Sequence, residues 1–343
     1  MSRPSDSPLL SIVLPVYNGE KYLATSLGSV VEAVELLAET ERSRVEVVLC
    51  DNHSTDRTAE LAEKYAPACE YRTVRPPVFE ENRTRNWHYG LSQARAPWMM
   101  MLHADDMLTP AGLSRLMRMC ERRLSSSAVL ITGRHRDFSE GLPPSRLRPR
   151  WPLSSLARGR DVRREVLAYH CMFPPFTVMR RATYEAVGGL DARYELLQDW
   201  QLWIRLLNEG DLAFFTGEFG RWRTHGFSEK YATMMAREVL VLSDEMSSLI
   251  PDFPPAKLAK LRTMHQARAR ILLPEGVPPE QILGASPSVA ALPTKEQAEA
   301  TMTEVYRIVR RGLLRVFLAG TMPAPFTGKG QGHGQHVEPT LSR

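Results

Sequence analysis

The first third of the chain alternates between short apolar runs and stretches in which apolar residues recur every three or four positions. Residues 9–17 (LLSIVLPVY) and 45–50 (VEVVLC) are rich in β-branched side chains and have the length of buried strands. Six apolar residues at helical spacing lie between them: Leu23, Leu27, Val30, Val31, Val34 and Leu37. This order predicts a strand, a helix and a second strand parallel to the first.

The same alternation continues as far as residue 133. Ser54 and Thr55 precede the next helical pattern, so a hydroxyl is predicted to cap it. Strands that alternate with helices indicate an α/β sheet of Rossmann type, whose ligands collect at the carboxyl ends of the strands. Asp51 and the HADD segment at 103–106 follow two of these strands. The further predicted elements are helices at 56–66, 82–94 and 112–124 and strands at 70–74, 98–103 and 128–133.

The pattern changes after this alternation ends. Nine arginines lie between Arg134 and Arg164, with several prolines and little apolar periodicity, which indicates a loop or an irregular lobe. Regular spacing returns at 174–210, where we predict a strand, a short helix, a turn and a longer helix. From about Ala232 onward the pattern is mainly helical.

The segment at 97–108 (PWMMMLHADDML) places two adjacent carboxylates directly after a buried run. Such a pair is costly at the end of a strand unless a cation or hydrogen-bond donors compensate it. Two interpretations fit. Asp106 and Thr109 precede Pro110, so they have the residue types that cap the start of a helix. Alternatively, Asp105 and Asp106 supply the oxygen ligands that Mg²⁺ or Mn²⁺ prefers.

Charge and cysteine content narrow the class of protein. Lysine and arginine exceed aspartate and glutamate by 44 to 39, a net charge of +5, which favours anionic ligands without identifying them. The first ten residues do not have the pattern of a signal peptide, and the sequence contains no apolar run of about 20 residues that would span a bilayer. The cysteines form no CxxC pair and predict free thiols in a reducing compartment: Cys50, Cys69, Cys120 and Cys171.

These features predict a cytoplasmic protein. A basic amphipathic helix is predicted within 305–318. It either packs on its own domain or makes peripheral contact with the inner face of a membrane.

Four segments in a fixed order carry a resemblance to a known family. They are LPVYNGEKYL (14–23), CDNHSTDRT (50–58), LHADD (102–106) and LLQDWQLWIRL (196–206). Their order and spacing resemble the family 2 glycosyltransferases, enzymes of the GT-A fold that use nucleotide-activated sugars. The resemblance covers roughly residues 10–228.

The resemblance implies a Rossmann-like α/β fold with a mixed, mostly parallel sheet flanked by helices. It places a GT-A domain at 9–230, with a nucleotide-sugar half at about 9–133 and an acceptor half at about 165–230. A mainly helical C-terminal extension is expected at 231–318. The ends, 1–8 and 319–343, are expected to be flexible or disordered.

The resemblance also implies a set of donor-binding residues. Pro15 and Tyr17 would hold the nucleotide base, and Asp51 would accept a hydrogen bond from it. Arg83 would meet the phosphates, and Asn86 lies three residues further on the same helical face. Packing for Tyr17 and a solvated helix face for Arg83 are the structural alternatives.

Asp105 and Asp106 correspond to the D-x-D region of the family, where one carboxylate binds Mn²⁺ or Mg²⁺ and the other contacts ribose or a bridging water. His103 stands where the family frequently has aspartate, and it either contacts the ligands or donates to a backbone carbonyl. The segment RWRTHGFSEK resembles a closing segment of the family. By that resemblance Arg223 and His225 would approach the diphosphate or the cation.

An acceptor hydroxyl needs a base that removes its proton as the new bond forms. Asp199 resembles the aspartate of the family's Glu-Asp or Gln-Asp motif at the start of a helix, which makes it the candidate base. Trp200 and Trp203 either line an acceptor surface or belong to the core. Gly188 and Gly189 permit a tight turn before this segment.

The resemblance thus implies an inverting, metal-dependent glycosyltransferase that moves a sugar from a nucleotide-diphospho-sugar to a glycan or lipid-linked acceptor in glycan or polysaccharide synthesis. UDP is the expected nucleotide, and GDP and dTDP stay open because no residue dictates the base. No nucleic-acid partner is expected. A dinucleotide-dependent oxidoreductase is disfavoured because the first turn, YNGEKY, lacks GxGxxG. A non-catalytic nucleotide-sugar-binding protein of the same fold is the alternative that fits. The arginines at 134–164 suggest an anionic acceptor.

Overall fold

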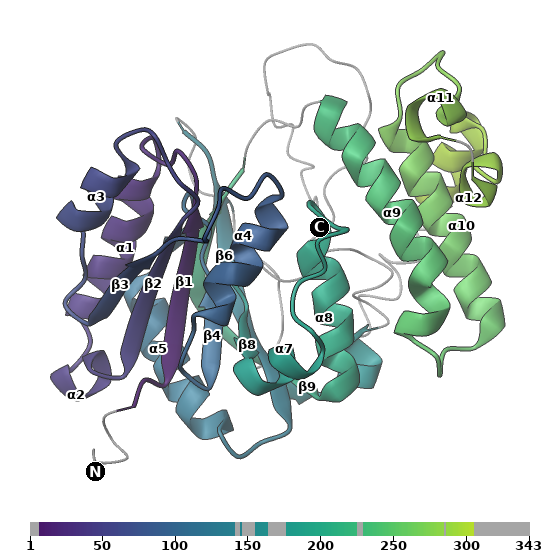
Figure 1. Cartoon of the computed structure of the whole chain (residues 1–343). Helices are drawn as coiled ribbons and strands as arrows, with labels where there is room; N and C mark the ends of the chain where they lie inside the picture. Colours follow the sequence, from purple (N-terminus) through teal and green to yellow (C-terminus); the bar gives the residue numbers. More distant parts are fainter. Residues whose placement is uncertain are drawn as a thin grey trace, which may run out of the picture.

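A twisted mixed sheet with helices on both faces forms the centre of the molecule in the computed structural model (Figure 1). The structure describes residues 7–140, 145, 155–163, 176–224, 229–284 and 286–304. Within these residues the sheet has nine strands, in the order β3-β2-β1-β4-β8-β6-β9-β5, with β7 paired to β9. The α/β class and the mixed, mostly parallel sheet predicted from the sequence are confirmed.

The first half of the sheet is parallel. β1 (Leu10–Val16) lies between β2 (Val45–Asp51) and β4 (Trp98–Met101), and β3 (Glu70–Val74) pairs with the outer side of β2. Helix α1 (Leu23–Glu35) connects β1 to β2, as the sequence predicted. All seven residues of β1 and of β2 are buried, which explains their continuous apolar runs.

The second half of the sheet mixes strand directions. β8 (Val178–Arg180) lies antiparallel between β4 and β6 (Ala128–Phe138), and β6 runs parallel to β9 (Asp211–Arg223). The short strands β5 (Met107–Leu108) and β7 (Ser155–Ala157) both pair antiparallel with β9. Apolar alternation did not predict β9, because glycines interrupt it and side-chain patterning is weak at such positions.

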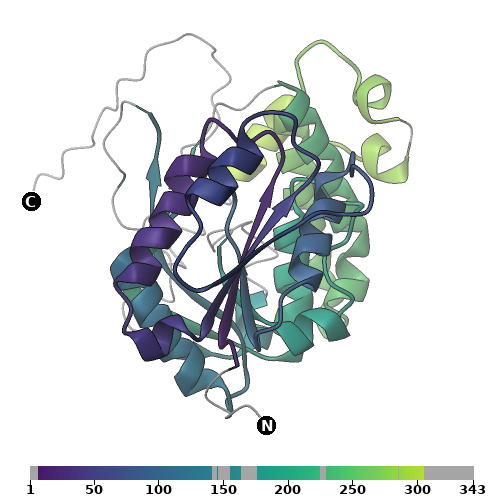
Figure 2. The same cartoon turned by 60° about the vertical axis from the view of Figure 1, so that its left-hand side comes forward.

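Two hydrophobic cores cover the two faces of the sheet, as expected for parallel strands flanked by helices. Figure 2 shows the purple helices on one side and the green helices on the other. The first core joins the sheet to α1, α3 (Thr58–Lys64) and α5 (Pro110–Arg123). The second joins it to α4 (Arg83–Ser92), α7 (Arg181–Ala186) and α8 (Gln198–Glu209). Alternate residues of β1 enter opposite cores, with Ile12 in the first and Val13 in the second.

A helical region follows β9, as predicted. It comprises α9 (Glu229–Leu249), α10 (Pro255–Leu272) and the short α11 (Pro279–Leu283) and α12 (Pro287–Ala290), which lie to the right of the sheet in Figure 1. α9 and α10 pack along each other and extend the second core. None of the helices in the described part of the chain is long and apolar enough to cross a membrane.

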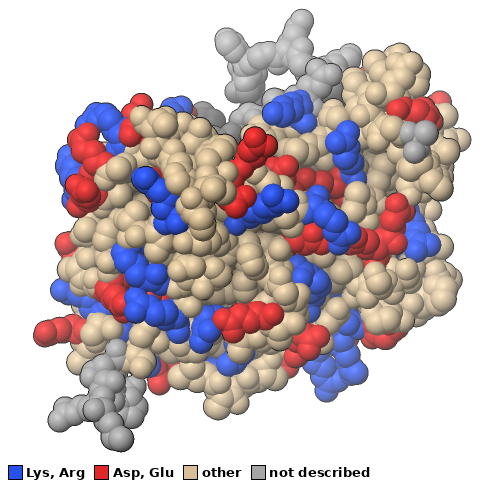
Figure 3. Space-filling model, in the orientation of Figure 1, with Lys and Arg blue, Asp and Glu red and all other residues tan. Residues whose placement is uncertain are grey.

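Several predicted segments cannot be compared with the structure. The basic helix and the C-terminal tail fall after residue 304, and residues 1–6 and most of 141–175 also lie outside the described ranges. On the face shown in Figure 3, positive and negative side chains are interspersed, so the net charge of +5 is not gathered into one patch there. Of the four cysteines, Cys50, Cys69 and Cys120 are free thiols and Cys171 lies outside the described residues.

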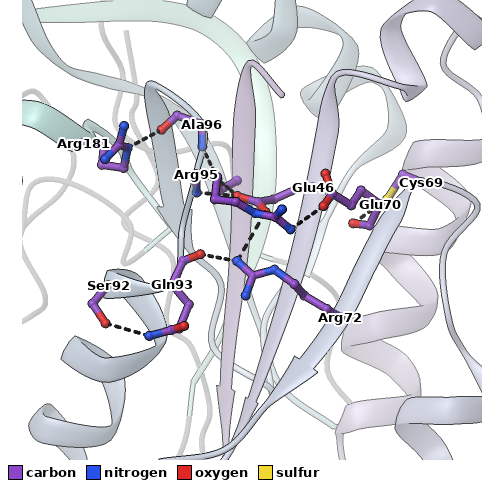
Figure 4. Close-up of polar contacts among 10 residues, drawn as sticks. Glu46, Cys69, Glu70, Arg72, Ser92, Gln93, Arg95, Ala96 and Arg181 are labelled. Carbon is purple, nitrogen blue, oxygen red and sulfur yellow. Dashed lines mark hydrogen bonds and ion pairs between the residues drawn. The ribbon is translucent and has the colours of Figure 1, made fainter. Parts of the chain in front are cut away.

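A buried carboxylate lies at the opposite end of the sheet from the HADD segment (Figure 4). Glu46 at the start of β2 is 0% exposed and accepts hydrogen bonds from Ser11 Oγ at 2.5 Å, from the Arg95 backbone N–H at 2.6 Å and from Arg95 Nε at 3.1 Å. Arg72 Nη2 lies 3.4 Å away. Burial alone would raise the pKa of Glu46, but these hydrogen bonds and charges outweigh it and the pKa is lowered.

Replacement of Glu46 by glutamine is expected to lower the free energy of unfolding by about 2 kcal/mol at pH 7, because Arg72 and Arg95 lose a charged hydrogen-bond partner. A lowered pKa stabilises the fold above the ordinary glutamate pKa of about 4.3, and this contribution is lost as the pH falls through the folded-state pKa. Urea unfolding of both proteins should therefore show a difference that shrinks below about pH 4. Glu70→Gln, an exposed partner of Arg95, is the control and should cost less than about 1 kcal/mol.

Candidate active site

The loops that follow β1 and β2 are joined by hydrogen bonds. The Asn18 N–H donates to Ser54 Oγ at 2.9 Å, and the Glu20 N–H donates to Asp56 Oδ2 at 3.0 Å. Asp56 also accepts from the Thr58 N–H, so it orders the loop before α3. The predicted hydroxyl cap is wrong, because α3 begins after Arg57 without a side-chain cap and the Ser54 hydroxyl is bonded to the β1 loop instead.

Asp51 lies at the carboxyl end of β2, where the sequence placed it. Its side chain is 2% exposed and accepts from Arg75 Nη2 at 2.5 Å and from the Ser54 N–H at 2.9 Å. Arg75 was not predicted, since only the fold brings the loop after β3 to this strand end. Pro15 is buried in β1 beside Cys50 of β2, and its role in holding the base stays a prediction.

Two exposed aromatic rings lie beside Asp51. Tyr17 follows Val16, which pairs with Asp51, and its ring centroid is 5.0 Å from that of Phe79 with the rings tilted by 53°. Both side chains are exposed, at 51% for Tyr17 and 44% for Phe79, so Tyr17 is not part of the core. Open aromatic faces next to a buried carboxylate suit a planar heterocycle that both stacks and donates a hydrogen bond.

The HADD segment forms a cluster after β4. One ligand atom from each of His103, Asp105 and Asp106 lies within 4.8 Å of the others. His103 Nδ1 is 3.8 Å from Asp106 Oδ2, and the imidazole packs against the Trp87 ring with centroids 4.6 Å apart. Thr109, not Asp106, caps α5, because its Oγ1 accepts from the Gly112 N–H at 3.1 Å. Capping therefore accounts for one of the two residues proposed for it.

Burial changes the protonation of two members of the cluster. Asp106 is 1% exposed, and burial together with the Asp105 charge raises its pKa well above the ordinary value. Burial lowers the pKa of His103 to about 4, which leaves the ring neutral near pH 7 with a lone pair for a ligand bond. Asp106 Oδ2 and His103 Nε2 are buried without a hydrogen-bond partner in the described part of the chain. Two carboxylates and a neutral imidazole are a donor set that fits a divalent cation.

Arg223 joins the end of β9 to the cluster. Its backbone N–H donates to Asp106 Oδ1 at 2.8 Å, and its Nε donates to the Asp105 carbonyl at 2.9 Å. The guanidinium lies between the rings of Tyr22 and Phe138, each centred 4.4 Å away, and the side chain is 7% exposed. Arg223 therefore lies beside the acidic pair, and its predicted approach to the diphosphate or the cation stays a prediction. His225 lies outside the described residues.

The two residues predicted on α4 point in different directions. Arg83 Nε donates to the Glu195 carbonyl at 2.7 Å, and its guanidinium lies over the Trp87 ring, 5.4 Å from the centroid. Asn86 is buried against β2, where its Oδ1 accepts from Cys50 Sγ at 3.2 Å. Arg83 therefore contacts the loop before α8, and Asn86 helps to pack α4 on the sheet.

Asp199 lies in the first turn of α8 and is 8% exposed. Its Oδ1 accepts from the Trp200 N–H at 2.7 Å. The tight turn predicted before this helix is confirmed, since Gly188 and Gly189 have φ values of +82° and +70°. Of the two readings of the tryptophans, the structure supports the core, because Trp200 and Trp203 are almost fully buried.

Two arginines of the arginine-rich segment 134–164 make contacts within the fold. Arg136 Nε donates to Glu218 at 2.9 Å, and Arg163, which is buried, pairs with Asp252 and Asn208. These two guanidinium groups are already engaged by the fold, so any contribution to acceptor binding would come from other members of the stretch.

Sequence and structure comparisons agree with one another. The Glycosyl transferase family 2 model matches residues 11–188. A PGL/p-HBAD biosynthesis glycosyltransferase of Mycobacterium bovis is 25% identical over 210 residues, which cover 60% of this chain and 73% of that relative. Putative glycosyltransferase EpsE of Bacillus subtilis is 25% identical over 214 residues, covering 60% of this chain and 69% of EpsE.

The fold resembles that of S. aureus TarS. TarS 1-349 in complex with UDP-GlcNAc aligns with a TM-score of 0.59 and 16% identity, over 90% of this chain and 92% of that chain. In another TarS structure the TM-score is also 0.59, and the chain spans 55% of the TarS length. At this identity the likeness shows a shared fold.

Proposed function

Because the chain belongs to glycosyl transferase family 2 and is thus a glycosyltransferase, we propose that it is metal-dependent and inverting and uses a UDP-sugar as its donor. The observation that carries this proposal is the cluster of His103, Asp105 and Asp106, whose ligand atoms lie within 4.8 Å of one another beside the carboxyl ends of the parallel strands. In open α/β sheets ligands bind at these ends. The proposed acceptor is a glycan or a lipid-linked hydroxyl compound.

Different residues at the site bind the nucleotide base and the metal ion. Tyr17 and Phe79 stack on the nucleotide base, and Asp51 accepts a hydrogen bond from it while Arg75 holds the carboxylate in place. Asp105 and Asp106 hold Mn²⁺ or Mg²⁺, with the neutral His103 ring as a third ligand. When bound, the cation stabilises the negative charge of the departing diphosphate.

Asp199 provides the base for the acceptor. It removes the proton of the acceptor hydroxyl as the oxygen forms a bond to the anomeric carbon and the bond to the diphosphate breaks. A single displacement of this kind inverts the anomeric configuration. The low exposure of Asp199, Asp106 and Arg223 limits the access of water to these groups.

Calorimetric titration with sugar nucleotides, with and without Mn²⁺, tests the proposal. UDP-GlcNAc is the first probe because S. aureus TarS is known in complex with it, and GDP and dTDP sugars serve as comparisons. We expect one donor to bind in the presence of Mn²⁺ and to bind at least about tenfold more weakly when the metal is removed by a chelator. Absence of binding by every donor under both conditions would overturn the proposed function.

Replacement of Phe79 by alanine is expected to weaken the binding of UDP by about tenfold, because stacking of a base on an aromatic ring is worth about 1–3 kcal/mol. Val78→Ala is the matched control, since Val78 is the adjacent exposed apolar residue. Calorimetry with UDP and Mn²⁺ measures both variants. Equal affinities in the two variants would remove Phe79 from the base-binding site.

A further inference from the structure

The segment before Asp199 is held by side chains from two helices. We call residues 191–197 the base loop, since they lead directly into α8. Its carbonyl groups accept hydrogen bonds from the start of α4. The donors are Asn82 Nδ2 to Ala192 O at 3.0 Å, Thr84 Oγ1 to Tyr194 O at 2.7 Å and Arg83 Nε to Glu195 O at 2.7 Å.

The backbone N–H groups of the base loop face the helical region instead. Three consecutive N–H groups donate to one carboxylate, that of Glu238 on α9: Glu195 N to Oε1 at 2.8 Å, Leu196 N to Oε2 at 2.9 Å and Leu197 N to Oε2 at 2.8 Å. α9 packs beside α8, as Figure 1 also shows. Seven residues further along α9, Glu245 accepts from the Tyr194 hydroxyl at 2.9 Å and from Arg193.

Glu238 is well placed to fix the start of α8. Leu197 is the N-cap of α8, so its N–H has no partner within the helix, and a negative charge there also interacts favourably with the helix dipole. The N–H groups of Glu195 and Leu196 belong to the base loop that leads into the helix. Glu238 is 5% exposed, so water cannot readily replace it as the acceptor. Burial raises the pKa of this carboxyl while the three N–H groups lower it, and the net pKa stays above the ordinary value.

We propose that Glu238 is a positioning residue for the reaction: the helical region fixes the base loop through this carboxylate and thereby sets the orientation of Asp199. This inference rests on the proposed function of Asp199. Only Gln198 separates Asp199 from Leu197, the last N–H that Glu238 binds. A small displacement of a catalytic group is costly, since an error of about 1 Å reduces a rate by about a hundredfold.

The proposed role of Glu238 predicts that its replacement lowers turnover without weakening donor binding. Glu238→Gln keeps the shape of the side chain but turns one oxygen into an N–H₂ group that cannot accept a hydrogen bond. Asp244→Asn is the control, because Asp244 lies on the same helix and contacts Ser288 rather than the base loop. The probe is UDP-GlcNAc with Mn²⁺ in the absence of acceptor, where water attacks the sugar, UDP leaves and Asp199 takes the proton.

We expect Glu238→Gln to reduce kcat for UDP release by about tenfold while the calorimetric Kd for UDP-GlcNAc changes less than about twofold. The double variant Asp199→Asn/Glu238→Gln should be no slower than Asp199→Asn alone, because Glu238 acts through Asp199. A purely structural role would make the two losses additive. Additive losses, or an unchanged kcat in Glu238→Gln, would overturn the inference.

Hydrogen exchange tests whether Glu238 holds the base loop, and it needs no turnover. In Glu238→Gln the amides of residues 195–197 should exchange faster than in the wild type, and Asp244→Asn should leave them unchanged. Unchanged exchange in Glu238→Gln would also overturn the inference. If the wild type binds no sugar nucleotide, the proposed function fails, whereas the exchange result still decides whether Glu238 holds the loop.

Discussion

Replacement of Asp105 by alanine is expected to abolish Mn²⁺-dependent donor binding. Asp105 contributes a carboxylate to the cluster with His103 and Asp106. Loss of a residue that only supports a metal ligand typically weakens metal binding by roughly 10–100-fold, so loss of a direct ligand should weaken it by more. The fold should tolerate this variant, since Arg223 Nε bonds to the backbone carbonyl of Asp105, which alanine retains. Calorimetry with Mn²⁺ in the presence of UDP measures the effect.

Asp106 is less suitable for this experiment. Its Oδ1 accepts from the buried Arg223 N–H, so Asp106→Ala would leave that group without a partner and would mix a folding defect with a loss of metal binding. Glu81→Ala is the control for Asp105→Ala, because it removes an exposed carboxylate from the loop before α4. Wild-type affinity for Mn²⁺ in Asp105→Ala would refute the assignment of the cluster as the metal site.

The parallel half of the fold could be predicted from the sequence, because burial of a strand on both faces leaves a run of apolar residues within the strand itself. Strands covered by helices on both faces are mostly apolar, and β1 and β2 are, apart from Ser11, Glu46 and Asp51. The carboxyl ends of parallel strands meet at one edge of the sheet, so Asp51 and the HADD segment could be placed near the site before the structure was known. The helical region was also predicted, since α9 and α10 are long helices.

Interactions between distant segments could not be predicted in this way. β9 is held by pairing with β6, and glycines weaken its own pattern. Arg75 and Phe79 join the candidate site because their loop is pinned to β2 through Asn52, whose amide exchanges hydrogen bonds with the backbone of Glu80. Glu238 is one acidic residue among many on a helix, and only tertiary packing shows which N–H groups it faces.

Local patterns did not show which neighbours the side chains of α4 contact. Helical spacing suggested that Arg83 and Asn86 share a face toward the donor, yet Asn86 packs against Cys50 and Arg83 reaches the base loop. Helical spacing shows which residues lie next to each other on a helix, but it does not show which other segments their side chains contact. The side chains at strand ends were predicted more accurately because the topology of the sheet fixes their surroundings.

Replacement of Asp199 by asparagine is expected to reduce the rate of sugar transfer by about 10²–10⁴-fold while the donor binds as in the wild type. The amide keeps the size of the carboxylate and can still accept a hydrogen bond from the Trp200 N–H, but it cannot take the proton of the acceptor. Removing a negative charge from the first turn of α8 costs only about 0.3–1 kcal/mol in helix stability, too little to unfold the protein.

Initial rates of UDP release from UDP-GlcNAc, together with calorimetric donor affinities, separate catalysis from binding. Glu209→Gln is the control, since it removes an exposed carboxylate at the other end of the same helix and should leave both quantities unchanged. A rate loss with unchanged donor affinity identifies Asp199 as a group that acts on the nucleophile. Wild-type rates in Asp199→Asn would show that another group takes the proton, and the role proposed for Glu238 would lose its basis as well.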